Sequence, residues 1–370
     1  MTKRKQVWQT FHGNRKDAEK ELGKLVEQAR NGGVVVSNDI TVGQWLDEWL
    51  NGAQSRMRPS TVVRYRGIIG QMSQTGLGAM RLQQVRPTHV EAYYGGLRQQ
   101  KLSASTMTLH HTVLFSGFRR AVKAGLIDRS PATDLENKPK RSKSKSSSDA
   151  REHCWNKSEV QRFLVEADKA GVQESAFYRL AIDSGARKGE LCALTWSDID
   201  LDGGIVTVSK TLLNATLKDG KAQVGPTKTG KSRTIRISTD TVQKLRAHRA
   251  DQRVFAMRNR DRFHDLNLVF SKQWGDVRMR NDVLGHPVAL NNLGERQFHP
   301  LCKKAGVKPV KFHALRHICA TLLLQAGTPV KVVSERLGHS TVTMTMEIYQ
   351  HVLPDMQEQA AAAMGGILNG

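Results

Sequence analysis

Residues 312–317 read FHALRH, residues 337–340 read LGHS and residues 348–351 read IYQH, and this C-terminal stretch decides how the rest of the chain is interpreted. In the first motif, spacings of three and four place His313, Arg316 and His317 on one face of a helix. The two histidines have the spacing of a metal-binding pair, but the glutamate of an HExxH motif is missing, so we expect no metal site. Tyr349 follows His339 by ten residues. Taken alone, it is an ordinary packing residue.

A second patch reads SGARKGEL over residues 184–191. Gly185 lets the backbone turn into a helix, and we expect Arg187 in the first turn of that helix. Glu190 then lies one turn later, where its carboxylate can hold the guanidinium. An isolated pair of this kind is usually a surface salt bridge.

A third patch reads PTKTGKSR over residues 226–233. It lies between the alternating patterns of residues 205–208 and 234–238, which predict strands. We therefore expect a hairpin whose tip can insert a lysine into a groove, with Lys228 and Lys231 as the candidates. Lysine-rich hairpin tips are also common on ordinary protein surfaces.

The composition indicates a soluble globular protein with a polyanionic partner. There are 57 Lys and Arg residues against 34 Asp and Glu, a formal charge of +23 that is distributed along the whole chain. This excess predicts nucleic-acid binding, with a generally basic, non-catalytic protein as the alternative. The four cysteines form no C-x-x-C pair, which argues against a disulfide framework or a zinc ribbon. No apolar run predicts a signal peptide or a membrane span, so we expect a cytoplasmic location.

The N-terminal half divides into two parts. Residues 7–10 predict a short strand and residues 18–29 one amphipathic helix, a piece too small to hold a core of its own. Thr41 and Gln44 predict a capping box, and prolines and serines predict further helix starts at Pro59, at Pro87 and at Ser103 or Ser105. Residues 41–135 therefore predict a bundle of four or five helices.

Residues 136–151 are rich in lysine and serine and predict an exposed linker. This linker is either a passive tether or a basic strap on DNA phosphates. A second domain is expected over residues 152–353, beginning with a capping box at Ser158 and Gln161, followed by strands and then, beyond about residue 240, by helices. Residues 354–370 form an alanine-rich tail with high helix propensity.

In chain order, R-x-x-E, a lysine on a hairpin, H-x-x-R, L-G-H and a tyrosine about ten residues later resemble the signature of the tyrosine site-specific recombinases of the phage integrase family. The catalytic positions would be Arg187, Lys228, His313, Arg316, His339 and Tyr349, with Glu190 in support. Lys231 is the alternative to Lys228, and Ile318 stands where the family often has threonine. The resemblance covers residues 41–353. It implies a mainly α fold with a small β-sheet (α+β), in which a helical core-binding domain and a mixed catalytic domain form a C-shaped clamp around DNA.

The resemblance also implies a mechanism. Tyr349 would attack the scissile phosphorus and form a 3′-phosphotyrosyl link, so that rejoining needs no ATP. The two arginines would stabilise charge on the phosphate, and His339 would hydrogen-bond to it. Lys228 would protonate the leaving 5′ oxygen, while His313 would accept the proton of the tyrosine. Arginines then do what metal ions do elsewhere, and no cofactor is expected.

Four functions remain open at this stage. The first is an integrase that inserts, and with helpers excises, a phage or mobile element; the others are a Xer-like resolvase, a type IB topoisomerase and an inactive DNA-binding regulator. The partners implied are double-stranded DNA attachment sites, further copies forming a tetramer on DNA, a host DNA-bending factor and an excisionase, in the bacterial cytoplasm. Residues 1–38 resemble part of the arm-binding domain of many integrases, either truncated or reduced.

Overall fold

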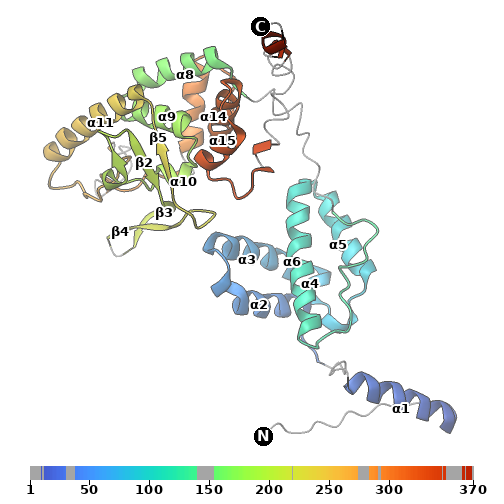
Figure 1. Cartoon of the computed structure of the whole chain (residues 1–370). Coiled ribbons are helices and arrows are strands. Elements are labelled where there is room, and N and C mark those ends of the chain that lie inside the picture. The colour runs from blue at the N-terminus through green and yellow to red at the C-terminus, as the bar shows by residue number, and fades with distance from the viewer. Residues whose placement is uncertain are drawn as a thin grey trace. The chain divides into compact units, whose positions relative to one another are not determined.

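The computed structural model describes residues 10, 12–30, 38–139, 154–218, 220–273, 283–290, 293–343, 345–346, 361–362 and 364–368 (Figure 1). The chain divides into two compact units, Met1–Lys145 and Ser146–Gly370, which we call the helical unit and the mixed unit. The division falls inside the predicted linker. Most of that linker lies outside the described residues, as do most of the strand predicted at residues 7–10 and most of the tail. Among the described residues, no helix has the length and apolar character needed to cross a bilayer.

The described residues of the helical unit form six α-helices and two short 3-10 turns. The helices are α1 (Arg15–Arg30), α2 (Val42–Ala53), α3 (Pro59–Ser73), α4 (Gly76–Ala79), α5 (Pro87–Gln99) and α6 (Ala104–Lys123), and the turns are Gln54–Arg56 and Leu82–Gln84. The capping box predicted at Thr41 and Gln44 is confirmed, since each side chain binds the backbone N–H of the other residue. Helices start at Pro59 and Pro87 as expected, and Ser103 caps α6.

One core fills the bundle formed by α2 to α6. Helices α2 and α6 approach closely at Gly117, where an added Cβ would collide with Leu46 Cδ2. The indole Nε1 of Trp45 donates to the Gly117 carbonyl oxygen at 2.9 Å and fixes this crossing. The bundle therefore has a defined packing and not only an apolar interior.

In the part of the mixed unit that the structure describes, two small antiparallel sheets lie among helices. Its helices are α8 (Lys157–Ala170), α9 (Val172–Ser184), α10 (Lys188–Leu191), α11 (Thr239–Arg258), a π-helical turn (Leu293–Phe298), α13 (His299–Lys304), α14 (Ala314–Gln325) and α15 (Val330–Leu337), with a 3-10 turn at Trp196–Asp198. Its strands are β1 (Ile199–Asp200), β2 (Ile205–Val208), β3 (Lys210–Lys218), β4 (Lys221–Pro226) and β5 (Arg233–Arg236). One sheet has the order β1-β2-β5, and β3 pairs with β4 in the other.

Two local predictions for this unit are wrong. Helix α8 is capped by Asn156, which accepts from the Glu159 N–H at 2.9 Å, and not by Ser158 with Gln161. The buried Trp155 fixes the chain just before this cap, so the helix begins two residues earlier than predicted. The predicted hairpin is also replaced: the two predicted strands do pair, with Val206 opposite Ile235, but β3 and β4 are inserted between them.

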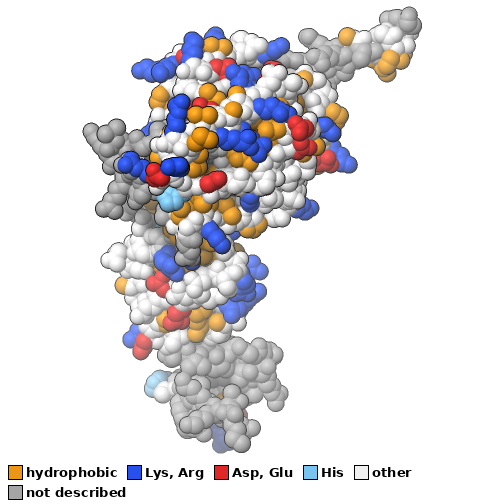
Figure 2. Space-filling model, turned by 90° about the vertical axis from the view of Figure 1, so that its left-hand side faces the viewer, with side chains coloured by type: hydrophobic (Ala, Val, Ile, Leu, Met, Phe, Trp, Pro, Cys, Tyr) orange, Lys and Arg blue, Asp and Glu red, His pale blue; other side chains and the backbone are white. Residues whose placement is uncertain are grey.

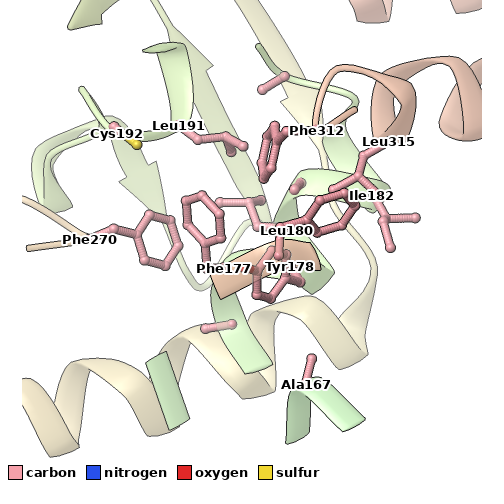
Figure 3. Close-up of a cluster of buried hydrophobic side chains, with 14 of the residues drawn as sticks. Ala167, Phe177, Tyr178, Leu180, Ile182, Leu191, Cys192, Phe270, Phe312 and Leu315 are labelled. Carbon is pink, nitrogen blue, oxygen red and sulfur yellow. The ribbon is translucent and has the colours of Figure 1, made fainter. Parts of the chain in front are cut away.

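The mixed unit has an aromatic core (Figure 3). Phe177 and Tyr178 of α9 pack against each other edge to face, with Phe312 beside both rings. Leu191 and Leu315 also belong to this core. Phe312, Leu191 and Leu315 are direct neighbours in sequence of candidate functional residues. The core therefore fixes the backbone from which the site projects.

Candidate active site

A glycine turn after α9 places the first candidate arginine. Gly185 has φ of 60° and ends α9 in the left-handed region, where glycine is strongly favoured. A Cβ at this position would collide with Leu337 Cδ2 and lie 3.1 Å from Cys319 Sγ. The sequence predicted Arg187 in the first turn of the next helix. Arg187 is instead the N-cap residue of α10. The turn is thus fixed both by its backbone conformation and by close packing.

Glu190 is a buried carboxylate between two arginines. Its side chain is 1% exposed, and Arg187 Nη1 donates to Oε1 at 2.8 Å. Arg233 Nη2 donates to Oε2 at 2.7 Å, and the backbone N–H of Arg187 donates to the same oxygen at 2.9 Å. Burial alone would raise the pKa of Glu190, but the hydrogen bond and charge of Arg233 and the hydrogen bonds of Arg187 bring it below its usual value. Arg187 and Glu190 therefore belong to a buried ionic cluster with Arg233 and do not form a surface salt bridge.

Arg316 lies in the first turn of α14 and is only 3% exposed. Its Nη1 donates to the Gly185 carbonyl oxygen at 2.9 Å, so the turn that positions Arg187 also anchors this second arginine. Burial, together with the charges of Arg187 and Arg233, lowers the pKa of Arg316 to about 9, which leaves it protonated at neutral pH. Its Nη2 is buried, and none of the described residues accepts a hydrogen bond from it. A buried donor of this kind is suited to a ligand oxygen.

The candidate histidines lie in the field of these cations. Partial burial and the charges of His317, Arg316, Arg187 and Lys228 lower the pKa of His313 to about 4. Burial and then the charges of Arg316 and Arg187 also lower the pKa of His339 to about 4. Both imidazoles are therefore neutral at pH 7 in the DNA-free chain. A neutral imidazole can accept a proton.

His339 follows the left-handed C-cap of α15, Gly338, whose φ is 65°. The carbonyl oxygen of Gly338 accepts from Arg187 Nη2 at 3.3 Å. The Nδ1 of His339 is 2.7 Å from the hydroxyl of Thr345, which is fully buried, and this contact orients the ring. The end of α15 is thus tied to Arg187, and Thr345 fixes the ring of His339 that follows it.

Lys228 lies in the turn that joins β4 to β5 and not at the tip of a hairpin, because these two strands belong to different sheets. The Gly230 N–H donates to the Thr227 carbonyl oxygen at 3.0 Å, and the buried Thr227 hydroxyl donates to the Lys231 carbonyl oxygen at 2.8 Å. The turn is thereby held by its own hydrogen bonds. The positive charge of Lys228 is one of the charges that lower the pKa of His313.

Hydrogen bonds anchor Arg187 and Arg316 on the turns at Gly338 and Gly185, and charge effects link His313, His339 and Lys228 to these arginines or to each other. Tyr349 lies outside the described residues, and its place in the site stays a prediction. Within the residues that the structure describes, no group of three His, Cys, Asp or Glu side chains is arranged to hold a metal ion.

Sequence reasoning missed Arg233 and Thr345. Arg233 is two residues from the buried Ile235 on the same strand, so both point to the same face. An arginine on the buried face of a strand was the signal that could have identified it. Thr345 carried no comparable signal, because its role depends on the course of the chain after α15.

The fold and the site agree with a comparison of the chain with protein families. Residues 155–356 match the phage integrase family, and residues 41–98 match the N-terminal SAM-like domain of phage integrases. Because the first match spans more than half of the chain, the chain belongs to the phage integrase family. It is a tyrosine recombinase, an enzyme that cleaves and rejoins DNA.

Individual relatives agree. A tyrosine recombinase XerC-like protein of Caldanaerobacter subterraneus subsp. tengcongensis is 28% identical over 375 residues, which cover 98% of this chain and 93% of the relative. The ICEBs1 integrase of Bacillus subtilis is 26% identical over 290 residues, covering 78% of this chain and 72% of that protein. The chain is also similar to the solved structure of the Tn1549 transposon integrase in complex with circular intermediate DNA, with a TM-score of 0.68, 20% identity and coverage of 88% of this chain and 100% of that chain. The predicted mainly helical α+β fold is confirmed.

Proposed function

We propose that this recombinase moves a phage or another mobile element between DNA attachment sites, with Tyr349 as its nucleophile. The proposal is carried by the Gly185 turn, which anchors Arg316 and precedes Arg187, with the imidazole of His313 in the field of both arginines, in a chain of this family. A phosphodiester would bring negative charge to a cluster in which the cations outnumber the single carboxylate of Glu190. The names of the related integrases support a mobile element as the cargo.

In the proposed reaction, the phenol oxygen of Tyr349 attacks the scissile phosphorus, and the bond from phosphorus to the 5′ oxygen breaks. The arginines, Arg187 and Arg316, bind the non-bridging oxygens and stabilise the charge of the pentacovalent transition state. The buried Nη2 of Arg316 supports this role, because it is a donor for which a phosphate oxygen is a suitable acceptor. The 3′-phosphotyrosyl link preserves the energy of the broken bond, and no ATP is needed.

Two proton transfers accompany this step. His313 accepts the phenol proton, which its lowered pKa permits because the free imidazole is neutral at pH 7. A bound phosphate brings negative charge close to the ring and raises the pKa toward a value suited to a general base. Lys228 donates a proton to the departing 5′ oxygen, and His339 donates a hydrogen bond to the phosphate. The reverse step returns both protons.

DNA binding is proposed to involve both units on one duplex, as in the clamp implied by the resemblance. Basic side chains are spread over the face shown in Figure 2. In the helical unit, exposed arginines on α3 and α6 include Arg64, Arg66, Arg119 and Arg120. Phosphate contacts of this kind release counterions, so affinity should fall steeply between low and moderate salt. An affinity that does not change with salt would contradict this interface.

We further propose a tetramer on two duplexes, a host DNA-bending factor and an excisionase as helpers, and a location on DNA in the bacterial cytoplasm. Residues 1–38 are proposed to contact arm-type sites, and the tail from residue 354 to dock on a neighbouring copy. A gel shift with and without residues 1–38 tests the first point. Unchanged binding to distal sites would contradict it.

The decisive test is trapping of the covalent intermediate. A preferred duplex is first selected from a random-sequence pool by binding to the wild-type protein and is then nicked close to the cleavage position, so that religation is prevented. The wild-type protein should form a covalent complex, in EDTA as well as in buffer, and Tyr349→Phe should form none. The matched control is Tyr178→Phe, which removes a phenol oxygen that is buried without a partner among the described residues.

Trapping by Tyr349→Phe, or loss of cleavage in EDTA, would contradict the mechanism. Relaxation of supercoiled plasmids that lack the selected site would favour a topoisomerase instead. Tight binding without any covalent product would favour an inactive regulator.

A further inference from the structure

Arg233 contacts the same buried carboxylate as a proposed catalytic arginine, but it lies on a different element. It projects from β5, its side chain is 9% exposed, and its Nη2 is 2.7 Å from Glu190 Oε2. Arg187 binds the other oxygen of that carboxylate from the start of α10. The two guanidinium groups are thereby held on opposite oxygens of one anion, and neither can shift without disturbing the other.

The same side chain also holds the chain segment that leads to His339. Its Nε donates to the carbonyl oxygen of Arg336 at 2.9 Å, in the last turn of α15. Its stem lies against Gly338, where an added Cβ would come within 2.9 Å of Arg233 Cδ and 3.1 Å of Nη1. A single guanidinium therefore bridges the carboxylate that orients Arg187 and the helix end that carries His339.

Arginine is required for this bridge because two of its nitrogens point to two different acceptors at the same time. A lysine would keep the positive charge beside Glu190. Its single ammonium group lacks the planar fork of a guanidinium, which reaches a carboxylate and a main-chain carbonyl at the same time. Arg233 also contributes to the lowered pKa of Arg316, which places it next to the cluster of cations. Its known hydrogen bonds are nevertheless to the protein itself.

We infer that Arg233 is a positioning residue, which fixes the guanidinium of Arg187 relative to the imidazole of His339. This inference rests on the proposed function, because it matters for the reaction only if both groups bind the scissile phosphate. Errors in placement of about 1 Å can slow an enzymatic step about 100-fold, so a small relaxation of this bridge should be visible in the rate.

The test compares Arg233→Lys with Arg236→Lys, which removes an exposed arginine from the same strand. Single-turnover cleavage of the nicked, selected duplex should slow at least about tenfold in Arg233→Lys, while the dissociation constant for the duplex changes less than about twofold. Arg236→Lys should match the wild-type protein in both measurements. A thermal melt shows whether each variant is folded.

Two further measurements separate positioning from a general loss of structure. The first replaces the scissile phosphate with a neutral methylphosphonate, which lacks the charge that Arg187 stabilises. On this substrate, the loss of cleavage rate relative to the wild-type protein should be smaller for Arg233→Lys, and also for Arg187→Lys. A folding defect would instead reduce the cleavage rate of both substrates by the same factor. The second adds Arg233→Lys to Arg187→Ala, where it should cause little additional loss.

The inference is overturned if Arg233→Lys cleaves at the wild-type rate, or if its defect is the same on both substrates and multiplies with that of Arg187→Ala. Failure of the wild-type protein to cleave the selected duplex would instead overturn the proposed function, and the inference with it. If Arg233→Lys does not fold, Arg233→Gln is used, because it keeps part of the stem and one donor.

Discussion

Replacement of Glu190 by glutamine should destabilise the mixed unit and slow cleavage. The carboxylate accepts three hydrogen bonds, two from Arg187 and one from Arg233, and is 1% exposed. A glutamine keeps one acceptor oxygen but turns an NH₂ group toward a guanidinium, so a buried ionic cluster is left without its anion. Removing one partner from a buried pair costs about 3–5 kcal/mol. For a unit of this size, that corresponds to a fall in melting temperature of about 10 °C.

The assay is differential scanning calorimetry of the full chain. The matched control is Glu166→Gln, in which the lost partner is the exposed Lys169, and the expected cost is at most about 1 kcal/mol. The helical unit supplies an internal reference, because Glu190 belongs to the mixed unit. A Glu190→Gln variant that melts within about 2 °C of the wild-type protein would refute the shared carboxylate, since such a shift is below about 1 kcal/mol.

The same variant has a pH signature. The pKa of Glu190 is lower in the folded chain than its ordinary value of 4.5. The stabilisation is therefore fully present above pH 4.5 and is lost as the pH falls through the folded-state pKa. The difference in melting temperature between the wild-type protein and Glu190→Gln should narrow under acidic conditions. A difference that stays constant would mean that the carboxylate charge contributes nothing.

Three other predictions concern the Gly185 turn, the N-cap of α2 and two buried histidines. Gly185→Ala should lower the melting temperature of the mixed unit and reduce cleavage, because the added Cβ meets Leu337 at a left-handed φ; wild-type values in both assays would contradict this close approach. Thr41→Ala should cost about 1 kcal/mol in denaturant unfolding, and Thr41→Ser should restore most of it. Burial lowers the pKa of His110 and His111, so the unfolded chain binds more protons below about pH 6.5. Thermal melts should therefore show the helical unit losing stability between pH 7 and pH 5, and His110→Gln should reduce that loss.

Local patterns predicted local structure well, with instructive failures. The capping box at Thr41 and the helix start at Pro59 depend on neighbouring residues and are confirmed. At α8 the structure replaces the predicted cap, Ser158 with Gln161, by Asn156 with Glu159. The hydroxyl of Ser158 instead donates to the Asn156 side chain at 2.7 Å, so the residue supports the cap that displaced it. Burial of Trp155 decided between them, and burial is not visible in the pattern.

The missed strands and the missed arginine have a common cause. In β3, apolar and polar residues do not alternate regularly, and its pairing with β4 shifts register between Leu212 and Asn214 and again before Leu217. A period of two was therefore not detectable. The bridge from Arg233 to Glu190 spans 43 residues of sequence, and only the folded sheet brings these residues together.

Both proposed catalytic arginines are anchored partly on the main chain, Arg316 on the carbonyl oxygen of Gly185 and Arg187 on that of Gly338. A main-chain carbonyl is present whatever side chain a residue carries, so neither anchor can be removed by ordinary substitution. Both carbonyls belong to glycines in the left-handed region, so a change that shifts either backbone turn should move an arginine that no altered side chain touches.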